Sequence, residues 1–279
     1  MLALAISVLS AVVFGHVMKF ATVRRANLRW VAACNYITGS SVCFLIMLSH
    51  PPRQAVAFTV LTGAWAGVSY LISLLFYFAA VARLGMSLAT SVNRISVALP
   101  VAAALIFWHE ALHPAQAVGL ALVVAALLLL GSGDSGISKA GAAQLLRFIL
   151  PLFLITGVGQ LGARIYSAGA PAANAYLYSA TLFAAAGVSG LVALALRPVR
   201  PQRQDVLLGL LLGAFNTVTN LSLLAALRAL PSALVFSISS AASVALAAIT
   251  GVLFWHERLS RPAMAAITAA TLAVVLLTQ

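Results

Sequence analysis

Charged residues are scarce in this chain of 279 residues, and acidic residues are nearly absent. Only 7% of the residues are charged, against about 25% in ordinary soluble domains, and just four are Asp or Glu. Hydrophobic residues make up 63% of the chain, against about 45–50% in soluble domains. A soluble fold this apolar could not keep its surface wetted. The composition therefore predicts an integral membrane protein.

Other absences exclude further classes of protein. The two cysteines, Cys34 and Cys43, fall in one apolar segment, so we expect free thiols and no disulfide framework. The chain lacks a Gly-x-x-x-x-Gly-Lys-Ser/Thr motif, which argues against built-in ATP use. The formal charge of +12 does not indicate nucleic-acid binding, because the basic residues lie mostly in short loops between apolar runs. We expect no cofactor and no metal ion.

The apolar residues form long runs. A helix that spans a membrane needs about 20 mostly apolar residues, and on this scale the chain predicts ten spans. They are residues 2–21, 30–49, 55–82, 86–108, 114–131, 147–167, 172–196, 205–228, 232–255 and 262–278. Short connections with proline or glycine separate most of them. The sequence therefore predicts an all-α integral membrane protein with ten transmembrane helices.

Two unrelated patterns occur twice at nearly the same spacing. The string Phe-Trp-His-Glu stands at 107–110 and at 254–257, and Gly-x-x-x-Gly stands at 63–67 and at 209–213. The offsets, about 147 residues, predict a first repeat at 1–131, a linker at 132–146 and a second repeat at 147–279. Because each repeat has five spans, the second must enter the membrane inverted, and inverted repeats are a recurring build of secondary transporters.

Two stretches carry a family resemblance. Pro100–Glu110 and Ala247–Leu259 are each a helix rich in small residues that runs into a glutamate. They resemble the corresponding helices of the drug/metabolite transporter superfamily, specifically its EamA-type members. The resemblance covers essentially the whole chain, and it implies two inverted five-helix repeats that transport metabolites by alternating access. Its motifs define a fold more than a substrate.

Polar residues inside the predicted spans mark a candidate solute site. Arg94 lies about 12 Å into the fourth span, at 1.5 Å per residue, and a cation at that depth normally faces a bundle interior or a wet cavity. Snorkelling of its long side chain to the near interface is the alternative. The other candidates for substrate binding come from the first, third, fourth, sixth, eighth and ninth spans. They are His16, Lys19, Tyr70, Asn93, Gln160, Arg164, Asn216, Asn220 and Ser240.

Two repeated motifs have structural interpretations. Glu110 and Glu257 could couple transport to protons, but a carboxylate at a helix end more often caps the N-terminus of the following helix. The Gly-x-x-x-Gly motifs predict close helix packing within each repeat. Such motifs also occur where helices dimerise, so a homodimer is left open.

The sequence favours a secondary transporter of a small polar solute, with no enzymatic chemistry. Because no acid lies at the depth of Lys19, Arg94 and Arg164, we expect a solute with a carboxylate or phosphate, such as an amino acid. A neutral or cationic solute is the alternative. A polytopic membrane enzyme and an accessory membrane subunit are the rivals from other classes. The expected partners are the solute and the lipid bilayer of a cell membrane, a bacterial inner membrane in particular.

The basic residues also predict an orientation. Odd-numbered connections carry eleven Lys or Arg residues and even-numbered ones carry three, Arg53, Arg164 and Arg228. By the positive-inside rule the odd-numbered connections face the cytoplasm and both termini face outward. The family resemblance implies the opposite orientation.

Overall fold

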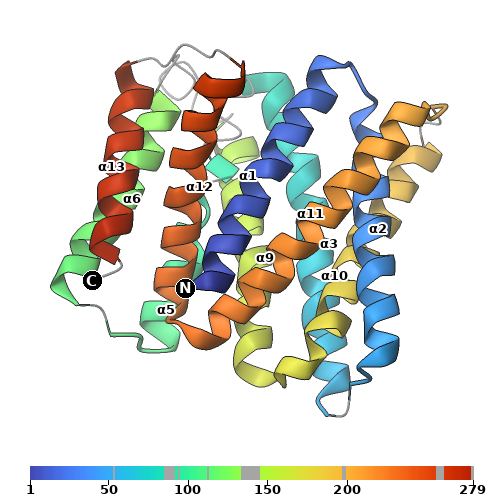
Figure 1. Ribbon diagram of the computed structural model, residues 1–279, viewed down its shortest axis with the longest axis horizontal. Helices are drawn as coiled ribbons and strands as arrows, with labels where there is room; N and C mark the ends of the chain where they lie inside the picture. The colour runs from blue at the N-terminus through green and yellow to red at the C-terminus, as the bar shows by residue number, and fades with distance from the viewer. Residues whose placement is uncertain are drawn as a thin grey trace. The chain divides into compact units, whose positions relative to one another are not determined.

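The computed structural model describes residues 1–52, 54–84, 92–93, 95–111, 113–132, 145–196, 199–255 and 261–277. Within these ranges the regular elements are all helical (Figure 1). The longer ones are α1 (Leu2–Val23), α2 (Leu28–Ser49), α3 (Val56–Leu84), α5 (Ala98–Phe107), α6 (Pro114–Ser132), α9 (Leu150–Gly169), α10 (Ala175–Leu196), α11 (Arg203–Ala229), α12 (Ser232–Trp255) and α13 (Arg261–Leu277). A π-helical turn, η1 (Leu145–Ile149), leads into α9, and a 3-10 turn, η2 (Ala172–Asn174), precedes α10.

Seven helical segments in the described ranges are long and apolar enough to cross a membrane. Three shorter apolar segments accompany them, Ala98–Phe107, Pro114–Ala126 and Ile267–Leu277. Large apolar side chains point outward, and Leu196, Phe107 and Phe254 are each more than 70% exposed. Such a surface suits lipid, so the chain is a multi-pass α-helical membrane protein. That there are ten spans in two inverted repeats stays a prediction.

The helix ends follow the turn residues of the sequence. Asn27 caps α2, since its side-chain oxygen accepts a hydrogen bond from the backbone N–H of Arg29 at 3.1 Å. Arg25, with φ of 53°, makes the preceding turn. The predicted linker at 132–146 is shorter at both ends than expected, because Ser132 still belongs to α6 and Leu145 begins η1. Residues 133–144 lie outside the described residues.

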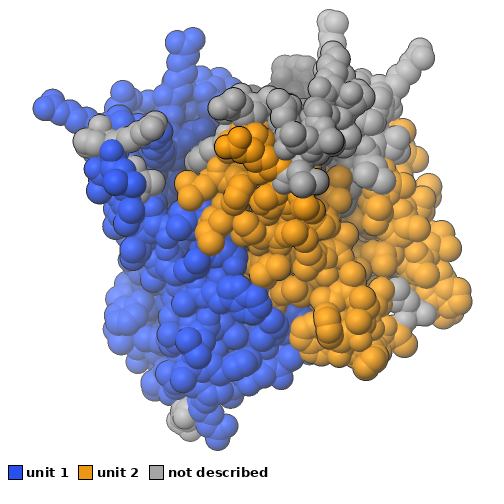
Figure 2. Space-filling model, turned by 180° about the vertical axis from the view of Figure 1, so that it is seen from behind, with its two compact units in different colours: residues 1–71, 162–229 blue, residues 72–161, 230–279 orange. Residues whose placement is uncertain are grey.

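The chain forms two compact units (Figure 2). Unit 1 contains residues 1–71 and 162–229, and unit 2 contains residues 72–161 and 230–279. Neither unit is one of the predicted sequence repeats, because each draws residues from both halves of the chain. The chain passes from one unit to the other within α3, within α9 and between α11 and α12.

In unit 1 the two Gly-x-x-x-Gly motifs let helices approach closely. A Cβ added at Gly67 of α3 would lie 2.7 Å from the Cβ of Ala185 in α10. One added at Gly213 of α11 would lie 2.7 Å from the carbonyl oxygen of Asn35 in α2. Internal packing was the right interpretation, but the expectation that each motif packs within its own half is wrong. Both contacts join a helix of one half to a helix of the other.

Unit 2 pairs α6 with α13, which lie side by side (Figure 1), and α12 with α5 and α13. Glu110 accepts hydrogen bonds from the backbone N–H groups of Ser232 at 3.0 Å and Ala233 at 2.8 Å, and from the Ser232 hydroxyl. The carboxylate therefore caps a helix, as the sequence predicted. The capped helix is α12, however, and not α6, which follows Glu110 in the chain. His109, with φ of 50°, turns the chain at this point.

Two hydrogen bonds of unit 1 each join parts of the chain that lie on the same side of the membrane in the predicted topology. In unit 1, Asp205 in the first turn of α11 accepts from the N–H of Asn27, which lies between α1 and α2, at 2.9 Å. Arg228 at the end of α11 donates to the carbonyl oxygen of Ala170, between α9 and α10, at 2.7 Å. In the predicted topology the first pair joins the first connection to the helix end beside the seventh. The second pair joins the sixth connection to the helix end beside the eighth. Both pairs fit helices that cross a membrane alternately.

Candidate functional site

Two hydrogen-bonded pairs of polar side chains in unit 1 join α11 to α2 and to α10, and we call the four residues the amide layer: Asn35, Ser179, Asn216 and Asn220. Asn216 donates through Nδ2 to Oδ1 of Asn35 at 3.2 Å, and Asn220 donates through Nδ2 to the hydroxyl of Ser179 at 2.8 Å. Ser179 is fully buried and Asn35 nearly so. Two of the predicted site residues, Asn216 and Asn220, thus each make a hydrogen bond to another helix, α2 and α10 respectively.

The direction of the Asn220 bond is fixed by its partner. The Ser179 hydroxyl donates its proton to the carbonyl oxygen of Ala175 at 2.8 Å, so it can only accept from Asn220. The amide of Asn220 must therefore present its NH2 to Ser179 and its carbonyl oxygen elsewhere. Among the described residues, nothing donates to the carbonyl oxygens of Asn216 and Asn220. The amide layer therefore retains two acceptors for a bound molecule.

An aromatic pair lies in the same unit. Tyr166 and Tyr178 stack with ring centroids 4.5 Å apart, and the guanidinium of Arg228 lies 5.1 Å from the Tyr166 centroid. The Tyr166 hydroxyl donates to the carbonyl oxygen of Pro171. The hydroxyl of Tyr178 is buried and has no hydrogen-bond partner within the described ranges. It adds a neutral group that can donate or accept.

Unit 2 holds a second polar network, which we call the hydroxyl chain: Ser73, Thr156 and Asn93. Thr156 donates to Oδ1 of Asn93 at 3.2 Å, and Ser73 and Thr156 share a short hydrogen bond. Because the Thr156 proton goes to Asn93, Ser73 must donate to Thr156. The Ser96 hydroxyl donates to the backbone carbonyl oxygen of Asn93 at 2.6 Å. The side-chain acceptor of Asn93 is thus used, and its NH2 group is what remains for a solute.

The predicted cations are distributed unevenly. Arg94, the predicted main anchor, lies outside the described residues. Lys19 lies four residues before the end of α1 and Arg164 five residues before the end of α9, so both are nearer a helix end than its middle. Both side chains are half-buried, as is that of His16. All three belong to unit 1.

The remaining predicted site residues are Tyr70 in unit 1 and Gln160 and Ser240 in unit 2. All three are half-buried, and their side chains make no hydrogen bond to any described residue. Each could therefore turn toward a solute without breaking a bond.

The described carboxylates accept hydrogen bonds from backbone N–H groups. Glu110 caps α12, and the buried Asp205 accepts from the N–H groups of Asn27 and Gln202, both at 2.9 Å. Glu257 and Asp134 lie outside the described residues. Within the described ranges no three His, Cys, Asp or Glu side chains gather as metal ligands would.

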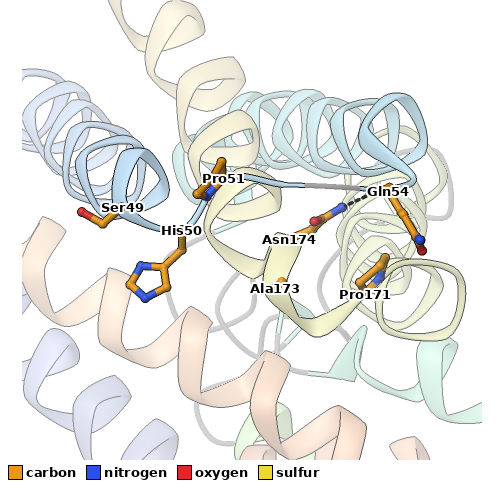
Figure 3. Close-up of a pocket in the computed structure, with 7 residues that line it drawn as sticks. All are labelled: Ser49, His50, Pro51, Gln54, Pro171, Ala173 and Asn174. Atoms are coloured by element: carbon orange, nitrogen blue, oxygen red, sulfur yellow. Dashed lines mark hydrogen bonds between the residues drawn. The ribbon is translucent and has the colours of Figure 1, made fainter.

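A cavity of about 450 Å³ opens at the end of α2 in unit 1 (Figure 3). It is lined by Ser49, His50, Pro51, Gln54, Pro171, Ala173 and Asn174. Sequence reasoning did not select this cavity, because its lining comes from two connections that are 120 residues apart in the chain. It also missed Ser179 and Thr156, since a single hydroxyl in an apolar helix carries no signal of its partner.

Comparison with known proteins points to transport. The family model described as "Sugar transport protein" matches residues 113–278, more than half of the chain. A solved structure titled "Crystal structure of protein" is similar over 99% of this chain and 98% of its own, with a TM-score of 0.72 and 18% identity. At that identity the likeness shows a shared fold alone. The comparison with curated proteins gave no match.

Proposed function

This chain belongs to the family of sugar transport proteins, and from that premise we propose that it carries a small polar solute across a membrane by alternating access. We propose neutral, hydroxyl-rich molecules, such as sugars, as its substrate class. The family description supports transport, and the polar groups of unit 1 support the choice of substrate.

The observation that carries this proposal is the unused hydrogen-bonding capacity of the amide layer. Asn216 and Asn220 each keep an unused carbonyl oxygen, and each also keeps one unused N–H, since the NH2 of asparagine can donate twice. Tyr70 and Tyr178 add neutral hydroxyls. A sugar hydroxyl can donate to such acceptors and accept from such hydroxyls. A carboxylate offers only acceptors and would leave the two amide oxygens unsatisfied.

A solute that bears a carboxylate is the second candidate, and it is favoured by Arg94. Arginine binds a carboxylate through two parallel hydrogen bonds, and Arg94 follows Asn93, whose remaining side-chain group is also a donor. Replacing Arg94 by Gln removes the charge and keeps hydrogen bonding. If the solute is an anion, Arg94→Gln should lower its flux by tenfold or more. Unchanged anion flux in a folded Arg94→Gln protein would exclude this anchor.

We further propose that the protein is an EamA-type member of the drug/metabolite transporter superfamily, built from two inverted repeats in a bacterial inner membrane. The glycine contacts support the repeat. Gly67 of the third predicted span packs on the seventh, and Gly213 of the eighth packs on the second. In the predicted repeat the third span is equivalent to the eighth and the seventh to the second. The two contacts are therefore equivalent, as twofold pseudo-symmetry requires.

The chain is proposed to work as a carrier and to catalyse no reaction. Both described carboxylates are engaged at helix ends, so we also propose that it does not exchange protons for cationic drugs through a carboxylate in mid-membrane. A homodimer stays a prediction. The Gly-x-x-x-Gly motifs are not its interface, because they are occupied by contacts within unit 1.

Counterflow tests the carrier. Purified protein is reconstituted into proteoliposomes loaded with millimolar unlabelled glucose, and entry of trace labelled glucose from outside is followed. A carrier that alternates access produces a transient accumulation of label above equilibrium, whereas a channel, an enzyme or an accessory subunit does not. Absence of such an overshoot for every neutral sugar and every organic acid tried would contradict the proposal.

A further inference from the structure

The cavity at the end of α2 contains a buried acceptor that has no partner. The side chain of Asn174 is fully buried, and its Oδ1 makes no hydrogen bond within the described ranges. Its Nδ2 donates twice, to the carbonyl oxygen of Gln54 at 2.6 Å and to the hydroxyl of Thr59 at 3.0 Å. An unsatisfied buried acceptor is unusual in a folded protein and calls for an explanation.

The orientation of this amide is fixed. The Thr59 hydroxyl donates its own proton to the carbonyl oxygen of Ala55 at 2.8 Å, so it can only accept from Asn174. The carbonyl oxygen of Gln54 likewise only accepts. Turning the amide over would set oxygen against oxygen at both contacts. In Figure 3 the nitrogen of Asn174 faces Gln54 and its oxygen lies on the side away from Gln54.

The walls of the cavity are preformed. Pro51 and Pro171 fix the backbone on its two sides, and the bonds of Asn174 join the connection after α2 to the turn η2. The imidazole of His50 packs on the ring of Tyr176, with centroids 5.7 Å apart, and its Nδ1 lies 3.3 Å from the carbonyl oxygen of Ile46. That carbonyl can only accept, so Nδ1 is the donor in this contact. The volume, about 450 Å³, falls in the range of small-molecule sites.

We propose that this cavity is a binding site for a neutral, hydroxyl-rich solute at the loop end of unit 1. The unpartnered Oδ1 of Asn174 is an acceptor, so a ligand that satisfies it must donate a hydrogen bond. No Asp, Glu, Lys or Arg is among the seven described lining residues, so neither an ammonium nor a phosphate would find a fixed counter-charge among them. The inference rests on the proposed function, and it makes the cavity a recruitment site through which the solute is first bound.

Two neighbouring alanines allow a matched test. Ala173 lines the cavity and Ala172 does not, yet both are exposed residues of the same 3-10 turn. In full-length protein in nanodiscs, Ala173→Cys and Ala172→Cys are labelled with an impermeant maleimide. The native Cys34 and Cys43 lie within α2, and unmodified protein gives their background. Glucose at millimolar concentration should slow labelling of Ala173→Cys about fivefold and leave Ala172→Cys within twofold.

Charged derivatives of the same ring test the ligand class. Glucosamine and glucose 6-phosphate should protect Ala173→Cys less than glucose. Stronger protection by either derivative would overturn the assignment of a neutral ligand. Equal protection of both cysteines by glucose would indicate a general conformational change and would overturn the site.

Transport separates this inference from the proposed function. Ala173→Trp, which fills the cavity from its rim, should raise the KM for glucose about tenfold with kcat within twofold, while Ala172→Trp leaves both unchanged. If unmodified protein transports glucose but Ala173→Trp does so equally well and Ala173→Cys is unprotected, the cavity is no solute site and the transporter proposal stands. If no neutral sugar is transported or protects, both proposals are wrong.

Discussion

The polar networks of the two units share one equivalent sequence position but differ in the groups that they leave unused. Asn220 in unit 1 and Ser73 in unit 2 stand 147 residues apart, which is the offset of the repeated Phe-Trp-His-Glu string. Asn220 donates to Ser179 through its NH2 and leaves its carbonyl oxygen unused. Ser73 donates to Thr156, and Thr156 donates to the side-chain carbonyl oxygen of Asn93, which is therefore occupied. The amide layer of unit 1 keeps two unused carbonyl oxygens, whereas the side-chain carbonyl oxygen in the hydroxyl chain of unit 2 is occupied. Duplicated helices can therefore keep a common packing while their polar groups diverge.

The largest effect is expected from replacing the two equivalent residues. Asn220→Leu removes the free acceptor, and Ser73→Ala removes a hydroxyl whose bonds stay within unit 2. Glucose uptake by proteoliposomes should fall by tenfold or more in Asn220→Leu and stay within twofold in Ser73→Ala. Equal losses of glucose uptake in both variants, at equal amounts of folded protein, would contradict the proposed difference between the two networks.

Glycine substitutions compare how tightly each unit is packed. A Cβ at Gly213 in unit 1 would meet the backbone oxygen of Asn35 at 2.7 Å, and one at Gly119 in unit 2 would meet Leu277 Cγ at 3.0 Å. One at Gly15 would meet nothing within 4 Å. Gly213→Ala should destabilise the protein by about 1–3 kcal/mol, the usual cost of overpacking.

The other two glycines supply the controls. Gly119→Ala should cost less than Gly213→Ala, because the contacts of the added Cβ are longer, 3.0 Å to Leu277 Cγ and 3.1 Å to the carbonyl oxygen of Ala273. Gly15→Ala should be neutral, or stabilising by up to about 1 kcal/mol through its helix propensity. Thermal unfolding in detergent ranks the three variants. A Gly213→Ala protein as stable as Gly15→Ala would show that α2 and α11 are not in close contact.

One carboxylate in each unit offers a test of coupling. Glu110→Gln and Asp205→Asn weaken bonds to backbone N–H groups, and each should cost about 0.5–2 kcal/mol, as the loss of a helix cap does. Neither should alter the dependence of flux on a proton gradient. Efflux of ethidium that collapses specifically in Glu110→Gln, with protein levels unchanged, would instead identify a proton-coupled drug antiporter.

The smallest effect concerns single interhelical hydrogen bonds. A double-mutant cycle on Ser73→Ala and Thr156→Val should give a coupling energy of about 0.6 kcal/mol, the average for such bonds in membranes. The Asn220–Ser179 pair of unit 1 should give a similar value by the same measurement. A coupling near zero in either unit would mean that its network does not form.

The helices of this fold were largely predictable, because hydropathy and proline turns mark where apolar segments start and stop. Which helix packs against which could not be predicted. Gly67 and Gly213 signalled close packing, but nothing in the sequence says that α3 meets α10 or that α11 meets α2. Glu110 was recognised as a cap, yet the helix it caps begins 122 residues later. Periodicity and turn chemistry are local, whereas these contacts depend on how distant helices pack.

The candidate site was predicted in part for the same reason. Asn216, Asn220 and Asn93 were selected because amides are costly in an apolar helix, and each proves to be bonded to another helix. The sequence emphasised positive charge, since Arg94 and Arg164 stand out by residue type. The free carbonyl oxygens of the amide layer could not be foreseen. They depend on Ser179 donating to its own helix, and that is a property of the folded backbone.

The predicted orientation stays open to a direct test. Cysteines placed in the linker at 133–141 should resist an impermeant thiol reagent on intact cells, because the fifth connection is predicted to face the cytoplasm. The even-numbered connections, including that of Ala173, should then be labelled from outside. Labelling of the linker from outside would reverse the assignment.

The measurement that bears most directly on the central claim compares two solutes with the same ring. Proteoliposomes with unmodified protein are given labelled glucose and labelled glucuronate, which differ by a carboxylate. Unused acceptors on Asn216 and Asn220 predict that glucose enters at least tenfold faster at equal concentration. Faster entry of glucuronate would contradict the account and would favour Arg94 as the anchor of an anionic substrate.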